Sequence, residues 1–320
     1  MQALVRDRYG GPDVLELRDV ARPVPQAGEV LVRVRACSIN DWDSGLLLGP
    51  TLPWQTGPPR QRILGSDIAG EVVEIGHGVS RFTRGDLVYG DLSGSAGWGG
   101  FAEYVCAPEQ RLALKSPRMT FEQAAALPQS GQLAVQALAA AGPLKRGQRI
   151  LINGAGGGVG TIGAQLAKPH GVELTGVDTA EKFETMTRAG FDHVVDYTKE
   201  DFTALGRRYD LIVDTRTTRA PSEYLRALAR GGTYATVGGP SMAKLLRIFL
   251  TGWCYRLATG KRLCLIGLRY SRDLDYLNGQ FEAGHLMPVI DGPYPLRDAR
   301  EAFRRYGAGH QLGKIVITME

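Results

Sequence analysis

Apolar and polar residues alternate in short runs over the first third of the chain. Runs at 14–17, 29–34, 68–75 and 103–105 place apolar residues at alternate positions or in short blocks, and Gly and Pro separate them. This spacing is typical of short antiparallel strands joined by turns. We therefore predict an antiparallel β-barrel or sandwich over the first 115 residues or so.

The pattern changes after about residue 120. A helical stretch at 121–141 is followed by strands that alternate with helices around Ile162, Glu184 and Leu225. The predicted strands are 149–153, 173–178, 193–197, 210–214, 232–237 and 262–266. Short buried strands with crossover helices are typical of a doubly wound parallel sheet. A strand at 289–294, a helix at 296–306 and a strand at 314–318 then predict a return to the first domain, within an α/β fold.

Composition narrows the class of protein. With 43% hydrophobic and 22% charged residues, the chain is not of the disordered type, and no apolar run reaches the roughly 20 residues of a membrane span. The start of the chain has no apolar signal-peptide core. The four cysteines form no CxxC pair, which argues against a disulfide framework or a zinc ribbon. We expect a cytoplasmic protein without stable membrane insertion.

The net charge of +5 and the pI of 9.0 raise the question of nucleic-acid binding. No repeat of interleaved aromatic and basic residues accompanies the charge, so we expect no nucleic-acid partner and favour a mildly basic enzyme surface that attracts an anionic cofactor. The 42 glycines have no regular period, which excludes collagen. Such a glycine content favours tight turns and close approach of backbone to a ligand.

A glycine loop follows the predicted strand 149–153. Gly154, Gly157, Gly158, Val159 and Gly160 belong to the run GAGGGVG, and a helix is predicted to begin there. Glycine lets the backbone approach a pyrophosphate, and the N–H groups of a helix N-terminus bind its charge. The loop is one residue longer than strict GxGxxG, and a purely structural turn is the alternative. We predict a dinucleotide site.

Cofactor choice is predicted to depend on the end of the next strand. Asp178 could bind a ribose 2′-hydroxyl and favour NADH, whereas Thr179, Lys182 and Tyr197 could hold the 2′-phosphate of NADPH. A solvated Lys182 and a merely packed Tyr197 remain the alternatives. We predict NADPH, with NADH possible because of Asp178.

Motifs along nearly the whole chain resemble those of one superfamily. They are YGGPDVLELRDV, GEVLVRVRACSIND, ILGSDIAGEVVEIGHGVSRFTRGDLVYG, FAEYVCAPE, LINGAGGGVG and GFDHVVDYTKEDF. With them the chain resembles the medium-chain dehydrogenase/reductase superfamily, in its zinc-free quinone-oxidoreductase-like branch. The resemblance implies a GroES-like β-barrel catalytic domain at 1–118 and 285–320 and a Rossmann NAD(P)-binding domain at 119–284, with a homodimer as the family expectation.

The resemblance also locates the positions where zinc-dependent members carry their metal ligands. Asn40, the Ser66-Asp67 pair and Gln129 occupy them here, and the cysteine-rich lobe between 85 and 107 is missing. Asparagine and serine are not usual zinc ligands. We therefore predict no metal site.

Without a Lewis acid, the resemblance favours hydride transfer to a conjugated acceptor over oxidation of a simple alcohol. The predicted function is zinc-independent, NADPH-dependent reduction of quinones or α,β-unsaturated carbonyl compounds. Asn40 could orient the substrate carbonyl or the nicotinamide ribose, and Asp43 could bind polar groups or water. The alternatives are an Asn40 that caps a turn and an Asp43 that caps a helix beginning near Ser44.

Three further residues are predicted to face the substrate. Gln129 and Leu133 replace residues that relatives often carry, and Arg216, in Asp-Thr-Arg-Thr, could meet an anionic or phenolic substrate or remain solvated. The rival functions are an enoyl reductase for a biosynthetic, polyketide-type intermediate, and a non-catalytic nucleotide-binding sensor or structural protein. The apolar and basic segment 241–261 is predicted to cover a substrate channel, with an amphipathic membrane-surface helix as the alternative.

Overall fold

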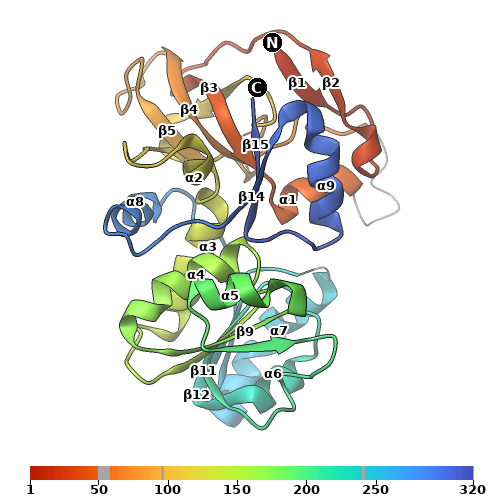
Figure 1. Ribbon diagram of the computed structural model, residues 1–320, viewed down its shortest axis with the longest axis vertical. Coiled ribbons are helices and arrows are strands. Elements are labelled where there is room, and N and C mark those ends of the chain that lie inside the picture. The colour runs from red at the N-terminus through yellow and green to blue at the C-terminus, as the bar shows by residue number, and fades with distance from the viewer. Residues whose placement is uncertain (50–57, 95–96, 240–241, 320) are drawn as a thin grey trace. The chain divides into compact units, whose positions relative to one another are not determined.

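The computed structural model describes residues 1–49, 58–94, 97–239 and 242–319, and the chain divides into two compact units (Figure 1). The first, the barrel unit, comprises 1–129, 270–282 and 290–320. The second, the sheet unit, comprises 130–269 and 283–289. This division groups 119–129 and 270–282 with the barrel unit.

The barrel unit is built on a mostly antiparallel sheet. Its strand order is β14-β15-β3-β4-β5-β7, β6 pairs with β3, and a separate ribbon joins β1 to β2. The strands are β1 (Gln2–Val5), β2 (Glu16–Asp19), β3 (Glu29–Ser38), β4 (Asp67–Ile75), β5 (Leu87–Asp91), β6 (Tyr104–Pro108), β7 (Leu112–Leu114), β14 (Ile290–Pro295) and β15 (Lys314–Thr318). The helices are α1 (Asp41–Leu48), α2 (Phe121–Ala125), α8 (Leu274–Glu282) and α9 (Ala299–Gly307).

Alternation explains why this sheet has an inner side. Val30, Val32 and Val34 on β3 are all buried and belong to one core with Ile68, while the intervening Arg33 is exposed. Burying a Val or Leu side chain contributes about 1.5–3 kcal/mol, so this core holds the strands in register. The strand register also brings the polar residues at the ends of β3, β4 and β5 next to one another.

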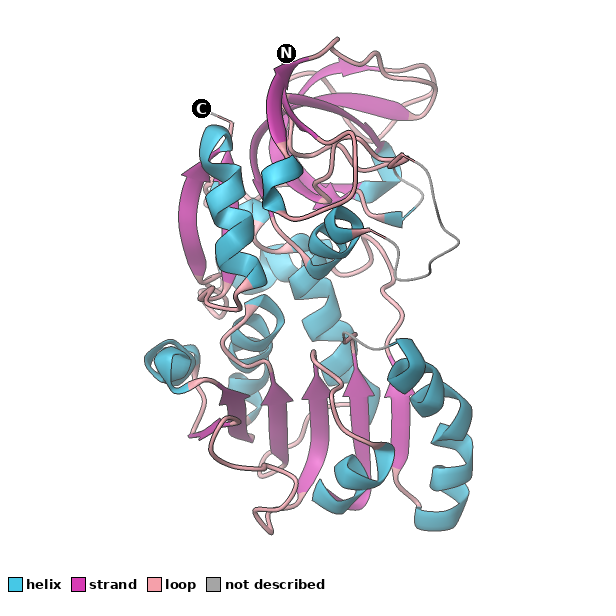
Figure 2. Cartoon of the chain, turned by 90° about the vertical axis from the view of Figure 1, so that its right-hand side faces the viewer, coloured by secondary structure: helices cyan, strands magenta, loops and turns pink. Residues whose placement is uncertain are grey.

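The sheet unit contains the predicted doubly wound sheet. Its strands are all parallel and lie in the order β10-β9-β8-β11-β12-β13. From β8 the chain first adds strands toward one edge of the sheet and then, from β11 on, toward the other edge. Helices lie on both faces of the sheet (Figure 2). The strands are β8 (Arg149–Asn153), β9 (Glu173–Asp178), β10 (His193–Asp196), β11 (Tyr209–Asp214), β12 (Leu228–Thr236) and β13 (Arg262–Leu265). The helices are α3 (Pro128–Leu138), which begins in the barrel unit, α4 (Gly158–Ala167), α5 (Phe183–Ala189), α6 (Pro221–Ala227) and α7 (Met242–Thr259). The predicted α/β fold class is confirmed.

Local details correct two predictions. The stretch 121–141 is not one helix, because it breaks between α2 and α3 at Pro128, which lacks an N–H group and disfavours a helical residue before it. Helix α1 begins at Asp41 rather than near Ser44, with Asn40 at its N-cap position; Asp43 takes part in capping it from the third helical position, where its carboxylate accepts from Asn40 N.

Candidate active site

The glycine loop joins β8 to α4, as predicted. Gly154 has a φ of +82°, and a Cβ atom there would lie 2.1 Å from Thr215 Oγ1. A Cβ at Gly160 would lie 2.4 Å from the carbonyl oxygen of Ala155. Gly157 is the N-cap of α4, so Gly158, Val159 and Gly160 form the first helical turn, where N–H groups lack intrahelical acceptors. These donors and the bare backbone fit the pyrophosphate of a dinucleotide.

Asp178 holds this loop in place. Its Oδ2 atom accepts a hydrogen bond from Gly156 N at 2.9 Å, and its Oδ1 atom accepts one from Thr179 N at 2.9 Å. Lys182 Nζ lies 3.2 Å from Asp178 Oδ1, and both side chains are buried. A Cβ at Gly156 would lie 2.5 Å from Lys182 Cδ. Asp178, which the sequence suggests as a ligand for a ribose 2′-hydroxyl, therefore also binds the glycine loop and Lys182.

The structure brings the four predicted selectivity residues together. Asp178 ends β9 and pairs in register with Asp196 on β10, so Tyr197 follows directly beside it. Tyr197 N donates to Asp178 O at 3.3 Å, and the Tyr197 side chain is exposed. Thr179 and Lys182 belong to the turn after β9. The backbone of Tyr197 thus lies beside the strand end that carries the buried Lys182–Asp178 pair.

Arg216 and Leu133 also belong to the sheet unit. Arg216 is exposed in the turn after β11, where its backbone N–H donates to Asp214 Oδ1 at 2.8 Å. Its Cγ atom lies 3.7 Å from the position of a Cβ at Gly154, so the arginine stem lies beside the glycine loop. Leu133 is half-buried on α3. Of the predicted substrate residues, Arg216 is thus a neighbour of the cofactor loop.

The barrel unit gathers polar groups at the ends of its strands. Antiparallel pairing puts Ser38 opposite Asp67 and Asp67 opposite Asp91. Ser38 Oγ donates to Asp67 Oδ2 at 3.1 Å, and Gln129 N donates to Asp67 Oδ1 at 3.1 Å. Asn40 follows the end of β3. We call this group the polar cluster; its members, all buried, are Ser38, Asn40, Asp43, Ser66, Asp67, Asp91, Gln129 and Lys314.

Lys314 is the cation of the polar cluster. Its Nζ atom donates to Asn40 Oδ1 at 2.5 Å and to Ile39 O at 3.0 Å, and it lies 3.3 Å from Asp67 Oδ2. The lysine is 4% exposed and Asp67 is fully buried. Because an ammonium group only donates, it fixes Asn40 with its oxygen toward Lys314 and its nitrogen toward Ser66 Oγ, at 3.1 Å. The Asn40 side chain also hydrogen-bonds to Asp67, which works against the rise in the pKa of that carboxyl group.

Asp43 links the loops beside Asn40. Its two oxygens accept from Asn40 N and Gly65 N, each at 2.9 Å. Burial raises the pKa of Asp43 to about 7, although these hydrogen bonds oppose the rise. Burial also raises the pKa of Asp91 to about 6, and that of Asp67, where the charge of Lys314 works against the rise. Carboxyl groups of this kind can hold protons near neutral pH.

Sequence reasoning found Asn40, Asp43 and Gln129 but missed the partners that hold them. Asp67 was identified only as occupying, with Ser66, a position where zinc-dependent relatives carry a metal ligand, and no sequence pattern pointed to Asp91 or Lys314. The signal for Lys314 was a single lysine at the start of the otherwise apolar strand Lys314–Thr318. Within the described ranges, no three His, Cys, Asp or Glu side chains are grouped to hold a metal ion.

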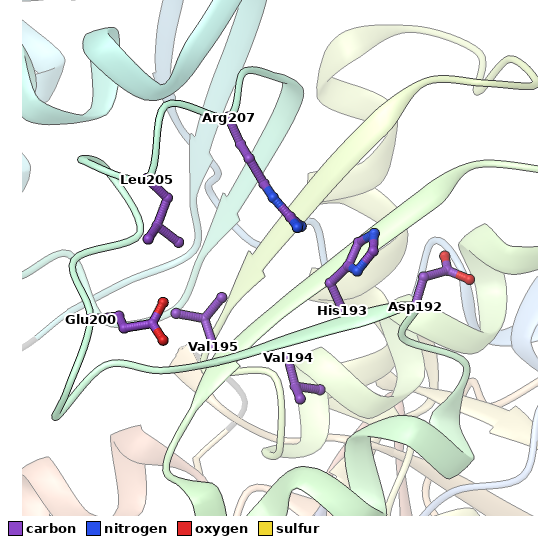
Figure 3. Close-up of a pocket in the computed structure, with 7 residues that line it drawn as sticks. All are labelled: Asp192, His193, Val194, Val195, Glu200, Leu205 and Arg207. Carbon is purple, nitrogen blue, oxygen red and sulfur yellow. The ribbon is translucent and has the colours of Figure 1, made fainter.

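A hollow in the sheet unit lies away from these residues. It runs along β10 and is shown in Figure 3, where Arg207 extends toward His193. Its lining residues are Asp192, His193, Val194, Val195, Glu200, Leu205 and Arg207. His193 Nε2 lies 2.9 Å from Glu173 Oε1, a contact between two partly exposed side chains of β10 and β9. No predicted site residue belongs to this hollow.

A barrel unit with a buried polar cluster and a parallel-sheet unit with a glycine loop define a two-domain, nucleotide-dependent oxidoreductase. Family comparisons agree: residues 26–118 match the alcohol dehydrogenase GroES-like domain, and residues 189–317 match the zinc-binding dehydrogenase family. The chain belongs to the medium-chain dehydrogenase/reductase superfamily, in its quinone-oxidoreductase-like branch. The predicted GroES-like and Rossmann domains, and the oxidoreductase class, are thereby confirmed.

Individual relatives cover almost the whole chain. It is 33% identical to the chloroplastic quinone-oxidoreductase QR1 of Triphysaria versicolor over 99% of this chain and 98% of that protein. It is 30% identical to the chloroplastic NADPH-dependent alkenal/one oxidoreductase of Arabidopsis thaliana over 99% of this chain and 79% of that protein. Among solved structures, the quinone oxidoreductase of Coxiella burnetii matches with a TM-score of 0.88 and 27% identity, over 100% of this chain and 99% of that one.

Proposed function

We propose that this protein is a zinc-independent reductase that uses NADPH to reduce quinones or α,β-unsaturated carbonyl compounds. The names of two relatives, a quinone oxidoreductase and an NADPH-dependent alkenal/one oxidoreductase, support these acceptor classes. The observation that carries the proposal is the contact between the Lys314 ammonium and Asn40. It holds a hydrogen-bond donor for a substrate oxygen beside a buried cation.

Asn40 is the residue we assign to the substrate oxygen. When hydride adds to the β-carbon of an enone, negative charge develops on the carbonyl oxygen. Lys314 holds the Asn40 oxygen, which directs the amide N–H groups away from the ammonium and polarises them. When substrate binds, its oxygen can take the Asn40 N–H that otherwise donates to Asp67, and this N–H then donates to the developing oxyanion. Bound NADPH supplies the hydride, with its pyrophosphate on the N–H groups at the start of α4.

The carboxyl groups of the polar cluster supply the acid–base capacity. Reduction of an enone or a quinone consumes protons as well as hydride. Asp43, with a pKa near 7, is hydrogen-bonded to the backbone of Asn40 and exchanges protons in the physiological range. We assign Asp43 to positioning Asn40 and to holding this proton, and Gln129 to orienting Asp67 through its backbone N–H.

An acceptor screen tests the proposal. Purified protein is mixed with NADPH and with a naphthoquinone, a straight-chain 2-alkenal, an α,β-unsaturated ketone or an enoyl thioester, and loss of NADPH absorbance is followed. Turnover of quinone or enone supports the proposal. Turnover confined to the enoyl thioester would favour the biosynthetic enoyl reductase, and tight NADPH binding without any turnover would favour a nucleotide sensor.

Cofactor choice is tested separately by fluorescence quenching with NADPH and NADH. We assign Lys182 and Tyr197 to the 2′-phosphate, with Asp178 as the group that Lys182 leaves. A preference for NADH would instead make Asp178 the ribose ligand. The homodimer and the cytoplasmic location remain predictions.

A further inference from the structure

Helix α7 presents a second apolar face to solvent. Helix α7 packs against β13: Ile248 belongs to one core with Leu263 of that strand, and a Cβ at Gly252 would lie 2.6 Å from Leu263 O. Leu245 is also buried. The opposite face carries large apolar side chains that are 55–70% exposed: Leu246, Phe249, Leu250, Trp253 and Leu257. We call these five residues the apolar stripe. The channel cover predicted for 241–261 stays a prediction, since exposed side chains fit either a substrate channel or a docking surface; Ser241 lies outside the described residues.

The apolar stripe is continuous along the helix. At about 100° per residue, its five members fall within roughly 100° around the axis. Arg247 lies about 100° to one side of Leu246 and Arg256 about 80° to the other, and both are exposed. An apolar strip with Trp and Phe, flanked by arginines, is the pattern of a helix that lies in the interface of a membrane.

The surrounding segment has an unusual charge. Residues 224–272 contain nine Lys and Arg and neither Asp nor Glu, so the rest of the chain carries a formal charge of −4 against the overall +5. Three of these nine residues, Lys244, Arg247 and Arg256, lie on α7 itself, and α7 carries neither Asp nor Glu. A basic segment beside an exposed apolar strip is complementary to anionic lipid headgroups.

We propose that the apolar stripe docks on the surface of an anionic lipid bilayer, with α7 parallel to the membrane. A second copy of the chain is a poorer occupant, because a two-fold contact between two α7 helices would bring the exposed Arg247 and Arg256 of both copies together with no acidic residue on either helix. Docking differs from spanning: no helix in the described part of the chain is long and apolar enough to cross a membrane. The proposal does not depend on the acceptor class.

Vesicle sedimentation tests this surface. The full-length protein is mixed with vesicles of phosphatidylcholine alone or of equal parts phosphatidylcholine and phosphatidylglycerol. We expect binding to the anionic vesicles that falls as salt is raised, and little binding to the neutral ones. The double variant Phe249→Ser/Trp253→Ser should reduce the partition coefficient at least about tenfold. Arg247→Gln/Arg256→Gln should reduce it about tenfold on anionic vesicles only.

The matched control is Leu114→Ser, which removes a similarly exposed apolar side chain from β7 of the barrel unit and should bind like the wild type. Unchanged thermal unfolding and NADPH titration show that each variant is folded. Wild-type protein that stays in solution with all vesicles would overturn the proposal. It would also be overturned if Phe249→Ser/Trp253→Ser bound vesicles normally, or if that variant changed only the oligomeric state.

Discussion

Replacing Lys314 by methionine should destabilise the barrel unit in a way that depends on pH. Methionine keeps the length and apolar stem of the side chain, but Asn40 Oδ1 and Ile39 O lose their donor and Asp67 loses its cation. Breaking a buried ion pair by removing one partner costs about 3–5 kcal/mol. We expect the free energy of unfolding at pH 8 to fall by that amount.

The loss should diminish in acid. Burial already raises the pKa of Asp67, and Lys314 opposes that rise. In Lys314→Met the folded-state pKa of Asp67 therefore rises further above its unfolded value, so the folded protein binds a proton that the unfolded chain releases. Stability then increases as pH falls through the higher pKa, by up to about 1.4 kcal/mol per pH unit. Neutral Asp67 no longer requires a cation.

Urea unfolding of the wild type and Lys314→Met at pH 6 and pH 8 measures this effect. Lys115→Met is the matched control, because Lys115 is equally buried but donates only to the carbonyl oxygens of Ser116 and Met119. Its cost should be about 1–3 kcal/mol and nearly equal at the two pH values. The reasoning is refuted if Lys314→Met loses the same stability at both pH values, or loses more at pH 6.

Three further predictions concern the loop, the buried acid and the cofactor. Gly156→Ala should weaken NADPH binding at least about tenfold in a fluorescence titration, because its Cβ would lie 2.5 Å from Lys182 Cδ. The control variant Gly279→Ala, on α8, would place a Cβ with no atom within 4 Å and should bind NADPH like the wild type. The free energy of unfolding of the wild type should fall as pH rises from about 4 to about 7, because folded Asp43 keeps its proton up to about pH 7 whereas the unfolded chain releases it earlier. Asp43→Asn should make this pH dependence less steep in urea unfolding. An unchanged pH dependence would contradict the raised pKa of Asp43. Tyr197→Phe and Lys182→Met should each raise the Kd for NADPH about tenfold or less while leaving that for NADH unchanged; equal losses for both nucleotides would exclude a 2′-phosphate role.

Local sequence patterns predicted the fold because its strands are either alternating or wholly apolar. Arg149–Asn153 forms β8 as predicted, and the glycine run follows it because a Cβ at Gly160 would meet the Ala155 backbone and one at Gly154 or Gly156 would meet nearby side chains. The single helix predicted over 121–141 was wrong because Pro128 was not weighed against helical periodicity. Helix α8 was missed, since its apolar residues Leu274, Leu277 and Phe281 give a short and weak pattern.

Only some residues of the candidate site could be predicted from the sequence. Asn40 and Asp43 lie three residues apart and could be found from a local motif, but Lys314 lies 274 residues from Asn40. Only the pairing of β15 with β3 brings them together. The burial that raises the pKa of Asp43 likewise depends on the folded barrel unit, which brings Gly65 and Asp67 beside it. Exposure of the apolar stripe on α7 could not be predicted either, because an amphipathic pattern does not say whether a second face is covered.

Transfer of deuterium from NADPH to an unsaturated ketone tests the central claim most directly. The protein is incubated with NADPH deuterated at both positions of nicotinamide C4, and the product is analysed by mass spectrometry and NMR. We predict a saturated ketone that carries one deuterium at the former β-carbon, formed as one equivalent of NADPH is consumed. NADPH that binds but transfers no deuterium to this ketone or electrons to any quinone would contradict the account.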